Sequence, residues 1–293
     1  MIYLPVLGAL SFALGTIFQK MVLVRKRINI RFYQTAEFFA IVLAMLPLIY
    51  FFWGVDADAL SFKNLFIFGL VIVFSVVANL FTYYSMKWEK VSNIEPAKIL
   101  EPLFVIILAI FFSYLVDNSL FERNLNVVIP AFIAGAALVF SHIEKHHLRF
   151  NKYFIAAILG SFFFALELVI SRLILDFYSP ITFYFLRCLS IFILSLVVFR
   201  PKMIKISGKV KWHIVLMGIL WTAYRVIVYY GYTELGVIFT TLVIMLAPVF
   251  IYLFAYFFLK EELKWKNIVA AVVIVLSVIY VVWIDNFIIY FFD

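Results

Sequence analysis

Long apolar stretches follow one another through almost the whole chain, separated only by short polar connections. A helix needs about 20 mostly apolar residues to cross the hydrocarbon core of a bilayer. We predict a transmembrane helix for each of ten stretches: 2–24, 33–53, 63–86, 92–115, 125–141, 152–175, 179–199, 212–233, 237–259 and 266–290. The connections leave no room for a soluble domain, so the sequence predicts an all-α polytopic membrane protein.

Composition supports this class. The 293 residues are 67% hydrophobic and 14% charged, whereas a soluble domain is about 45–50% apolar and about 25% charged. Cys188 is the only cysteine, which excludes an intramolecular disulfide and a cysteine-based zinc site. His142, His146 and His147 are interpreted as residues of a solvated loop rather than metal ligands. We therefore expect no cofactor and no bound metal.

Lysine and arginine residues concentrate in alternate connections. The connections after the first, third, fifth, seventh and ninth segments hold 17 of them, whereas the opposite connections hold only Lys63 and Arg123. Because cytoplasmic loops retain Lys and Arg, we predict a multi-pass protein of the cell (inner or plasma) membrane with both termini outside the cytoplasm. The same distribution explains the net charge of +8, so nucleic-acid binding is not expected.

The chain contains an internal duplication. In each half the same spacing separates a tyrosine pair from a proline: Tyr83-Tyr84 from Pro102, and Tyr229-Tyr230 from Pro248. Each half, 1–146 and 147–293, then holds five predicted helices. Because five is odd, the second half enters the membrane upside down relative to the first, as the loop charges also indicate. Inverted repeats of this kind are common in secondary transporters.

Three motifs of the second half resemble a known family. Tyr229–Gly236, Leu246–Phe250 and Phe258–Glu262 are similar to the EamA-type repeat of the drug/metabolite transporter (DMT) superfamily. The resemblance implies ten helices in two inverted five-helix repeats. It also implies transport of a small molecule without a bound cofactor, usually export and often proton-linked. The first half departs from the pattern, because Ser113–Asn118 stands where the second half has Lys260-Glu-Glu262.

Charged residues occur inside the predicted helices, where each costs about 2.5–3.5 kcal/mol near the bilayer centre. Glu95, Lys98 and Glu101 are spaced by three and form a column on one helix face. We expect the column to line the central cavity, with Lys98 and Glu101 nearest the substrate. The alternative is a self-satisfied ion network that packs helices. Pro102 cannot donate a hydrogen bond to the Lys98 carbonyl, which is expected to remain free for water or substrate.

Four further charges are candidate site residues. Glu167 and Arg225 are expected either to pair across the cavity or to hold the two ends of a zwitterion. Glu37 and Arg187 occupy comparable positions in the two halves and are expected to gate opposite mouths. Glu101 and Glu167 are the candidates for proton coupling, because burial disfavours the charged form of a carboxyl group.

Polar and aromatic residues complete the predicted substrate site. Tyr84 and Tyr230 are candidates for presenting a hydroxyl or ring face to a substrate amine, and Asn79 is a candidate polar lining residue. The alternative for the tyrosines is helix packing or an interfacial aromatic belt.

The sequence favours a secondary active transporter, an exporter by its resemblance, that moves a small amino-acid-like or drug-like metabolite by alternating access with possible proton coupling. A second transport hypothesis is movement of phosphorylated or lipid-linked sugars or nucleotide sugars, with Lys98, Arg187 and Arg225 binding phosphate. A non-transporting membrane subunit and a lipid-modifying enzyme are less favoured, and no catalytic residues are predicted. The expected partners are a small-molecule substrate and the lipid bilayer, and the protein is expected to be a monomer or homodimer.

Overall fold

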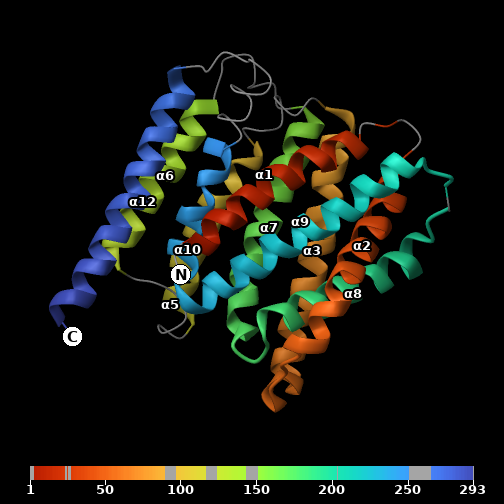
Figure 1. The fold of residues 1–293 in the computed structure, drawn as a ribbon, viewed down its shortest axis with the longest axis horizontal. Helices are drawn as coiled ribbons and strands as arrows, with labels where there is room; N and C mark the ends of the chain where they lie inside the picture. The colour runs from red at the N-terminus through yellow and green to blue at the C-terminus, as the bar shows by residue number, and fades with distance from the viewer. Residues whose placement is uncertain are drawn as a thin grey trace.

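The structure, a computed structural model, describes residues 3–23, 25, 28–89, 97–116, 124–142, 151–202, 204–250 and 265–292, with side chains in the last helix up to Ile284. In these residues the regular structure is helical, apart from one isolated β-bridge between Val55 and Tyr178 (Figure 1). The elements are α1 (Tyr3–Leu23), α2 (Ile30–Phe52), the 3-10 helix η1 (Ala57–Leu60), α3 (Phe62–Trp88), α5 (Leu100–Leu115), α6 (Leu125–His142), α7 (Lys152–Leu175), α8 (Pro180–Phe199), α9 (Gly208–Glu234), α10 (Val237–Ile244) and α12 (Trp265–Phe292).

The helices suit a bilayer. Seven of those described, α1, α2, α3, α7, α8, α9 and α12, are long and apolar enough to cross a membrane, and α5, α6 and the α10 region are shorter apolar helices. Large apolar side chains such as Phe39, Phe66 and Trp283 are exposed on the outer faces, where lipid replaces water as the neighbour. The prediction of a polytopic helical membrane protein is confirmed.

The segment predicted as one helix over 237–259 is broken. α10 ends at Ile244, and the Met245 N–H bonds to both Thr241 and Leu242 carbonyls before one more helical turn begins. The break precedes Pro248, which has no N–H to donate to the Ile244 carbonyl. The following motif, Phe258–Glu262, lies outside the described residues.

The corresponding segment of the first half, around Pro102, is also broken. A helical turn at 97–98 ends before α5 begins at Leu100, so Pro102 lies in the first turn of α5. There a missing N–H costs no intrahelical bond. The Lys98 carbonyl accepts a hydrogen bond from Ser161 Oγ at 3.4 Å, so the prediction of a free carbonyl was wrong. Glu95 and Pro96 lie outside the described residues.

The most extensive helix packing joins elements distant in sequence: α1 with α9, α3 with α7, α2 with α8 and α6 with α12. Small residues allow close approach where α9 packs on α2 and where α7 packs on α3. A Cβ at Gly218 of α9 would lie 2.8 Å from the backbone of Ala40 in α2, and a Cβ at Gly160 of α7 would lie 2.6 Å from Thr82 Oγ1 in α3. These contacts hold the helices that surround the polar interior.

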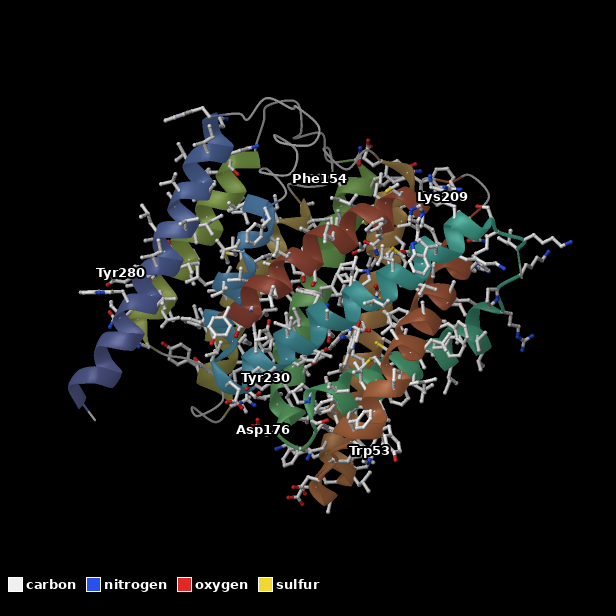
Figure 2. The ribbon with its side chains drawn as sticks, in the orientation of Figure 1. Trp53, Phe154, Asp176, Lys209, Tyr230 and Tyr280 are labelled. Carbon is white, nitrogen blue, oxygen red and sulfur yellow. The ribbon has the colours of Figure 1, made fainter. Side chains whose placement is uncertain are left out.

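The two ends of the helix bundle differ in charge. Figure 2 shows Lys209, in the first turn of α9, at the upper end, and Asp176, after α7, at the lower end. Asp56 and Asp58 follow α2 at the same end as Asp176, because the Asp56 N–H bonds to the Phe177 carbonyl. The alternation of basic and acidic connections along the sequence thus becomes a basic end and an acidic end.

Candidate functional site

A polar cavity of about 60 Å³ lies between α1, α2, α3, α7, α8, α9 and the start of α5. Six of the predicted substrate-site residues line it: Glu37, Asn79, Lys98, Glu101, Arg187 and Arg225. Glu37, Asn79, Arg187 and Arg225 are each at least nine-tenths buried, whereas Lys98 and Glu101 are half-buried. A charged group inside a membrane protein typically faces a partner or a wet cavity, and here both occur together.

Glu167 of α7 lies behind the cavity as the centre of an ion cluster. Its side chain is 0% exposed, with Oε1 at 3.2 Å from Arg187 Nη1 and Oε2 at 3.5 Å from Arg225 Nη2. Tyr229 of α9 donates to Glu167 Oε1 at 2.8 Å and accepts from Arg187 Nη1 at 2.6 Å. One carboxylate therefore lies between two guanidinium groups, which leaves the cluster with a positive charge.

Arg225 is the member of this cluster whose guanidinium group has a donor without an acceptor among the described residues, and its side chain lines the cavity. Its Nη1 is buried and makes no hydrogen bond to the described residues, although the side chain is 7% exposed. The guanidinium lies over the rings of Phe164 and Tyr224, 5.6 Å and 5.5 Å from their centroids. A buried N–H of this kind normally has an acceptor, so this face of Arg225 suits a carboxylate or another anionic group.

A second cluster surrounds Glu37 of α2. The Tyr83 hydroxyl hydrogen-bonds to Glu37 Oε2, and Gln19 Nε2 donates to Oε1 at 3.5 Å. The Tyr83 hydroxyl also donates to Asn79 Oδ1 at 2.7 Å. Among the described residues no cation forms an ion pair with Glu37. Its partners are neutral, whereas those of Glu167 include two cations.

An apolar cavity of about 80 Å³ adjoins the first and shares Phe12, Lys98, Glu101 and Tyr224 with it. It lies between the two helix breaks, since Pro102 and its neighbours line one side and Met245 to Pro248 the other. A smaller cavity of about 20 Å³ also touches Glu101 and Tyr224. Glu101 thus lies where polar and apolar spaces meet.

The structure separates the predicted residues into two groups. Glu37 and Arg187 line one cavity rather than opposite mouths. Tyr84 and Tyr230 line none of these cavities, and Tyr84 packs instead against the Tyr153 ring at 5.4 Å. One residue corresponds to about 100° of helix rotation, so the first member of each tyrosine pair, Tyr83 or Tyr229, is the buried one.

Sequence reasoning also missed Gln19, Tyr184, Trp221 and Tyr224, which line the polar cavity. The sequence held a signal that could have identified a further site residue only in α3, where that residue is Tyr83. Asn79 and Tyr83 are spaced by four, which places them on one helix face, and Asn79 was a candidate while Tyr83 was not.

The fold and the cavity define a class, a polytopic helical membrane protein with a charged interior. Residues 151–283 match the EamA-like transporter family. This match confirms the resemblance of the second half to the EamA-type transporters of the DMT superfamily. The family is one of membrane transporters rather than enzymes.

The fold is similar to known structures, and 29 chains of solved structures match it. One of them, titled "Crystal structure of protein", has a TM-score of 0.66 at 14% sequence identity and covers 97% of both chains. At this identity the likeness concerns the fold alone. No curated protein matches the chain by sequence.

Proposed function

We propose that this protein is a secondary transporter that moves a small zwitterionic solute, such as an amino acid, by alternating access. The observation that carries the proposal is the pair of opposite charges offered to one cavity. Arg225 presents a buried Nη1 that has no acceptor among the described residues, and Glu101 presents a carboxyl group. The solute's carboxylate would bind Arg225 and its ammonium group would lie near Glu101, while its side chain would enter the apolar cavity.

Cavity size favours a small solute. A cavity needs at least about 10–15 Å³ to hold a single water, and drug-sized ligands occupy pockets of about 300–1,000 Å³. The adjoining polar and apolar cavities measure about 60 Å³ and about 80 Å³. These dimensions suit an amino acid better than a nucleotide sugar. The phosphate hypothesis also loses support because Arg187 and Arg225 both contact Glu167, which offsets part of their positive charge.

Equivalent positions support the proposal that 1–146 and 147–293 are inverted repeats. The pattern of inward-facing positions is the same on α3 and α9, at a constant offset of 146 residues: Ser75, Asn79 and Tyr83 correspond to Trp221, Arg225 and Tyr229. All but Ser75 and Tyr229 line the polar cavity directly, and those two hydrogen-bond to Arg187. Packing of α1 on α9 is likewise matched by packing of α7 on α3.

The paired helix breaks support alternating access. Discontinuous helices at the interface of two repeats are a recurring feature of secondary transporters, because unwound backbone is tolerated there only beside a cavity. α5 packs on α10, and the breaks that precede Pro102 and Pro248 face the same apolar cavity. Small changes at these breaks would open the cavity toward one end or the other.

The charge difference between the ends supports an orientation in the cell membrane. The end that carries Lys209 would face the cytoplasm, by the positive-inside rule. Both termini would then lie on the opposite side, and the direction of net transport would be export, as is usual for the family.

Thermal unfolding of the purified protein tests the substrate class. The probes are L-leucine, 4-methylpentanoate, which lacks its amine, and isopentylamine, which lacks its carboxylate; the other amino acids and sugar phosphates follow. Stabilisation by an amino acid but by neither truncated analogue is expected. Arg225→Gln should abolish the stabilisation, whereas Arg31→Gln, at an exposed position of the basic end, should retain it. Stabilisation by sugar phosphates alone would contradict the proposal.

A further inference from the structure

The hydrogen bonds around Tyr83 fix where one proton lies. Asn79 Nδ2 donates to the Ser75 carbonyl at 2.7 Å. The opposite orientation of the amide would place two acceptors against each other, so the network sets the assignment. Asn79 Oδ1 must then face the Tyr83 hydroxyl, 2.7 Å away, and it accepts the hydroxyl proton.

The same hydroxyl hydrogen-bonds to Glu37 Oε2. A tyrosine hydroxyl has one proton and an ionised carboxylate has none to donate. Because Tyr83 donates its single hydroxyl proton to Asn79 Oδ1, the hydrogen bond between Tyr83 and Glu37 requires a proton on Glu37. The carboxylic acid donates to the Tyr83 oxygen, and its other oxygen accepts from Gln19 Nε2. Each hydrogen bond in this series, from Asn79 through Tyr83 and Glu37 to Gln19, has one donor and one acceptor only when Glu37 is neutral.

The surroundings of Glu37 agree with a neutral acid. The side chains that face it are Tyr33 from α2, Tyr83 from α3, Gln19 from α1 and Trp221 from α9, none of which is a cation. The charged groups of the same cavity are Lys98, Glu101, Arg187 and Arg225, and none of them is within ion-pair distance of Glu37 in the described residues. Ionising a buried carboxyl group without a cation is costly.

Glu167 is the opposite case. Two arginines contact it, and both rely on it as their shared carboxylate inside the protein. This contrast favours Glu37 over Glu167, which was one of the two candidates for proton coupling, with Glu101, that the sequence suggested.

We infer that Glu37 is the proton-binding site of this transporter; its use in the transport cycle rests on the proposed function. When the cavity opens, Glu37 releases its proton to water, and the Tyr83 hydroxyl turns from Asn79 Oδ1 to the carboxylate. The freed Asn79 is one turn from Ser75, whose Oγ accepts from Arg187 Nε at 2.8 Å. The proton on Glu37 is thereby linked to the arginine cluster that faces the solute, and the next proton from water restores the first arrangement.

Infrared titration of the protein in lipid nanodiscs, without any solute, tests the inference. The wild type should show the carbonyl stretch of a protonated carboxylic acid at neutral pH, and this band should disappear reversibly on titration to strongly alkaline pH. Glu37→Gln should remove the band. Glu101→Gln is the matched control and should keep it. Tyr83→Phe should shift the band to higher frequency, because the acid loses its acceptor.

Three results would overturn the inference: a band that persists in Glu37→Gln, a band lost in Glu101→Gln instead, or a band that is unaffected by alkaline pH. If Glu37→Gln does not fold, the Tyr83→Phe shift decides, and an unshifted band rejects the assignment. Because no solute is present, failure of the amino-acid proposal in thermal unfolding leaves this result standing, and the two proposals fail separately.

Discussion

Removing the charge of Glu167 and removing the charge of Arg187 should lower the free energy of unfolding by different amounts. Glu167→Gln leaves Arg187 and Arg225, both buried, without their shared carboxylate. Removing one partner of a buried ion pair costs about 3–5 kcal/mol, because the remaining charge is uncompensated, and Glu167→Gln removes the partner of two arginines at once. Arg187→Met instead leaves a balanced pair of Glu167 and Arg225. It forfeits the hydrogen bonds to Ser75 and Tyr229, and hydrogen bonds to charged groups are worth about 1.5–3 kcal/mol each.

We therefore expect Glu167→Gln to lower the free energy of unfolding more than Arg187→Met, although Met is the less conservative replacement. The assay is equilibrium unfolding by sodium dodecyl sulfate in mixed micelles. Asp176→Asn is the control: its partner Arg172 is 2.7 Å away, but the Asp176 side chain is 51% exposed, so a loss of about 0–1 kcal/mol is expected. The reasoning is refuted if Arg187→Met destabilises as much as Glu167→Gln.

Two further variants and a labelling experiment test the packing and the site. Gly218→Val should destabilise by about 1–3 kcal/mol in the same unfolding assay, because its Cβ would lie 2.8 Å from the Ala40 backbone. The control Gly69→Val, with no neighbour within 4 Å, should not destabilise. Equal effects of the two variants would contradict close packing of α9 on α2. Tyr229→Phe should destabilise through its lost bonds to Glu167 and Arg187, and Tyr50→Phe, 84% exposed, should be neutral; a neutral Tyr229→Phe would argue against the cluster. Cys188 is fully buried, so a water-soluble maleimide should label the folded protein far more slowly than the unfolded protein, and equal rates measured by mass spectrometry would be inconsistent with the packing around α8.

The helices were predictable because bilayer thickness sets their length, and apolar runs of that length are visible in the sequence. The broken helices were less so. Pro102 and Pro248 marked both places, yet a proline can lie in a first turn or follow a break, and only the surrounding backbone decides between these positions. The Lys98 carbonyl illustrates the point, because its partner Ser161 comes from another helix.

The charged residues of the site were visible because each is anomalous within an apolar helix. Which charges meet could not be read from the sequence. Glu167 contacts Arg187 and Arg225 from two other helices, and those contacts depend on how the helices are rotated and packed. The tyrosines show the same limit, since Tyr83 and Tyr84 differ by one residue but face different neighbours.

The packing of α1 on α9 has a consequence for how the protein is made. Roughly 185 residues separate these helices, and synthesis at about 5–20 residues per second delays the contact by roughly 10–40 s. During that time the apolar faces of the first half have lipid as their neighbour, which costs little. The buried carboxyl groups have partners within their own half. Glu37 contacts Gln19 and Tyr83 of the first half, and Glu167 contacts Arg187 and Arg225 of the second. Each half can therefore enter the bilayer with these carboxyl groups already partnered, and later assembly adds apolar packing and a few polar contacts, such as that of Arg187 with Ser75.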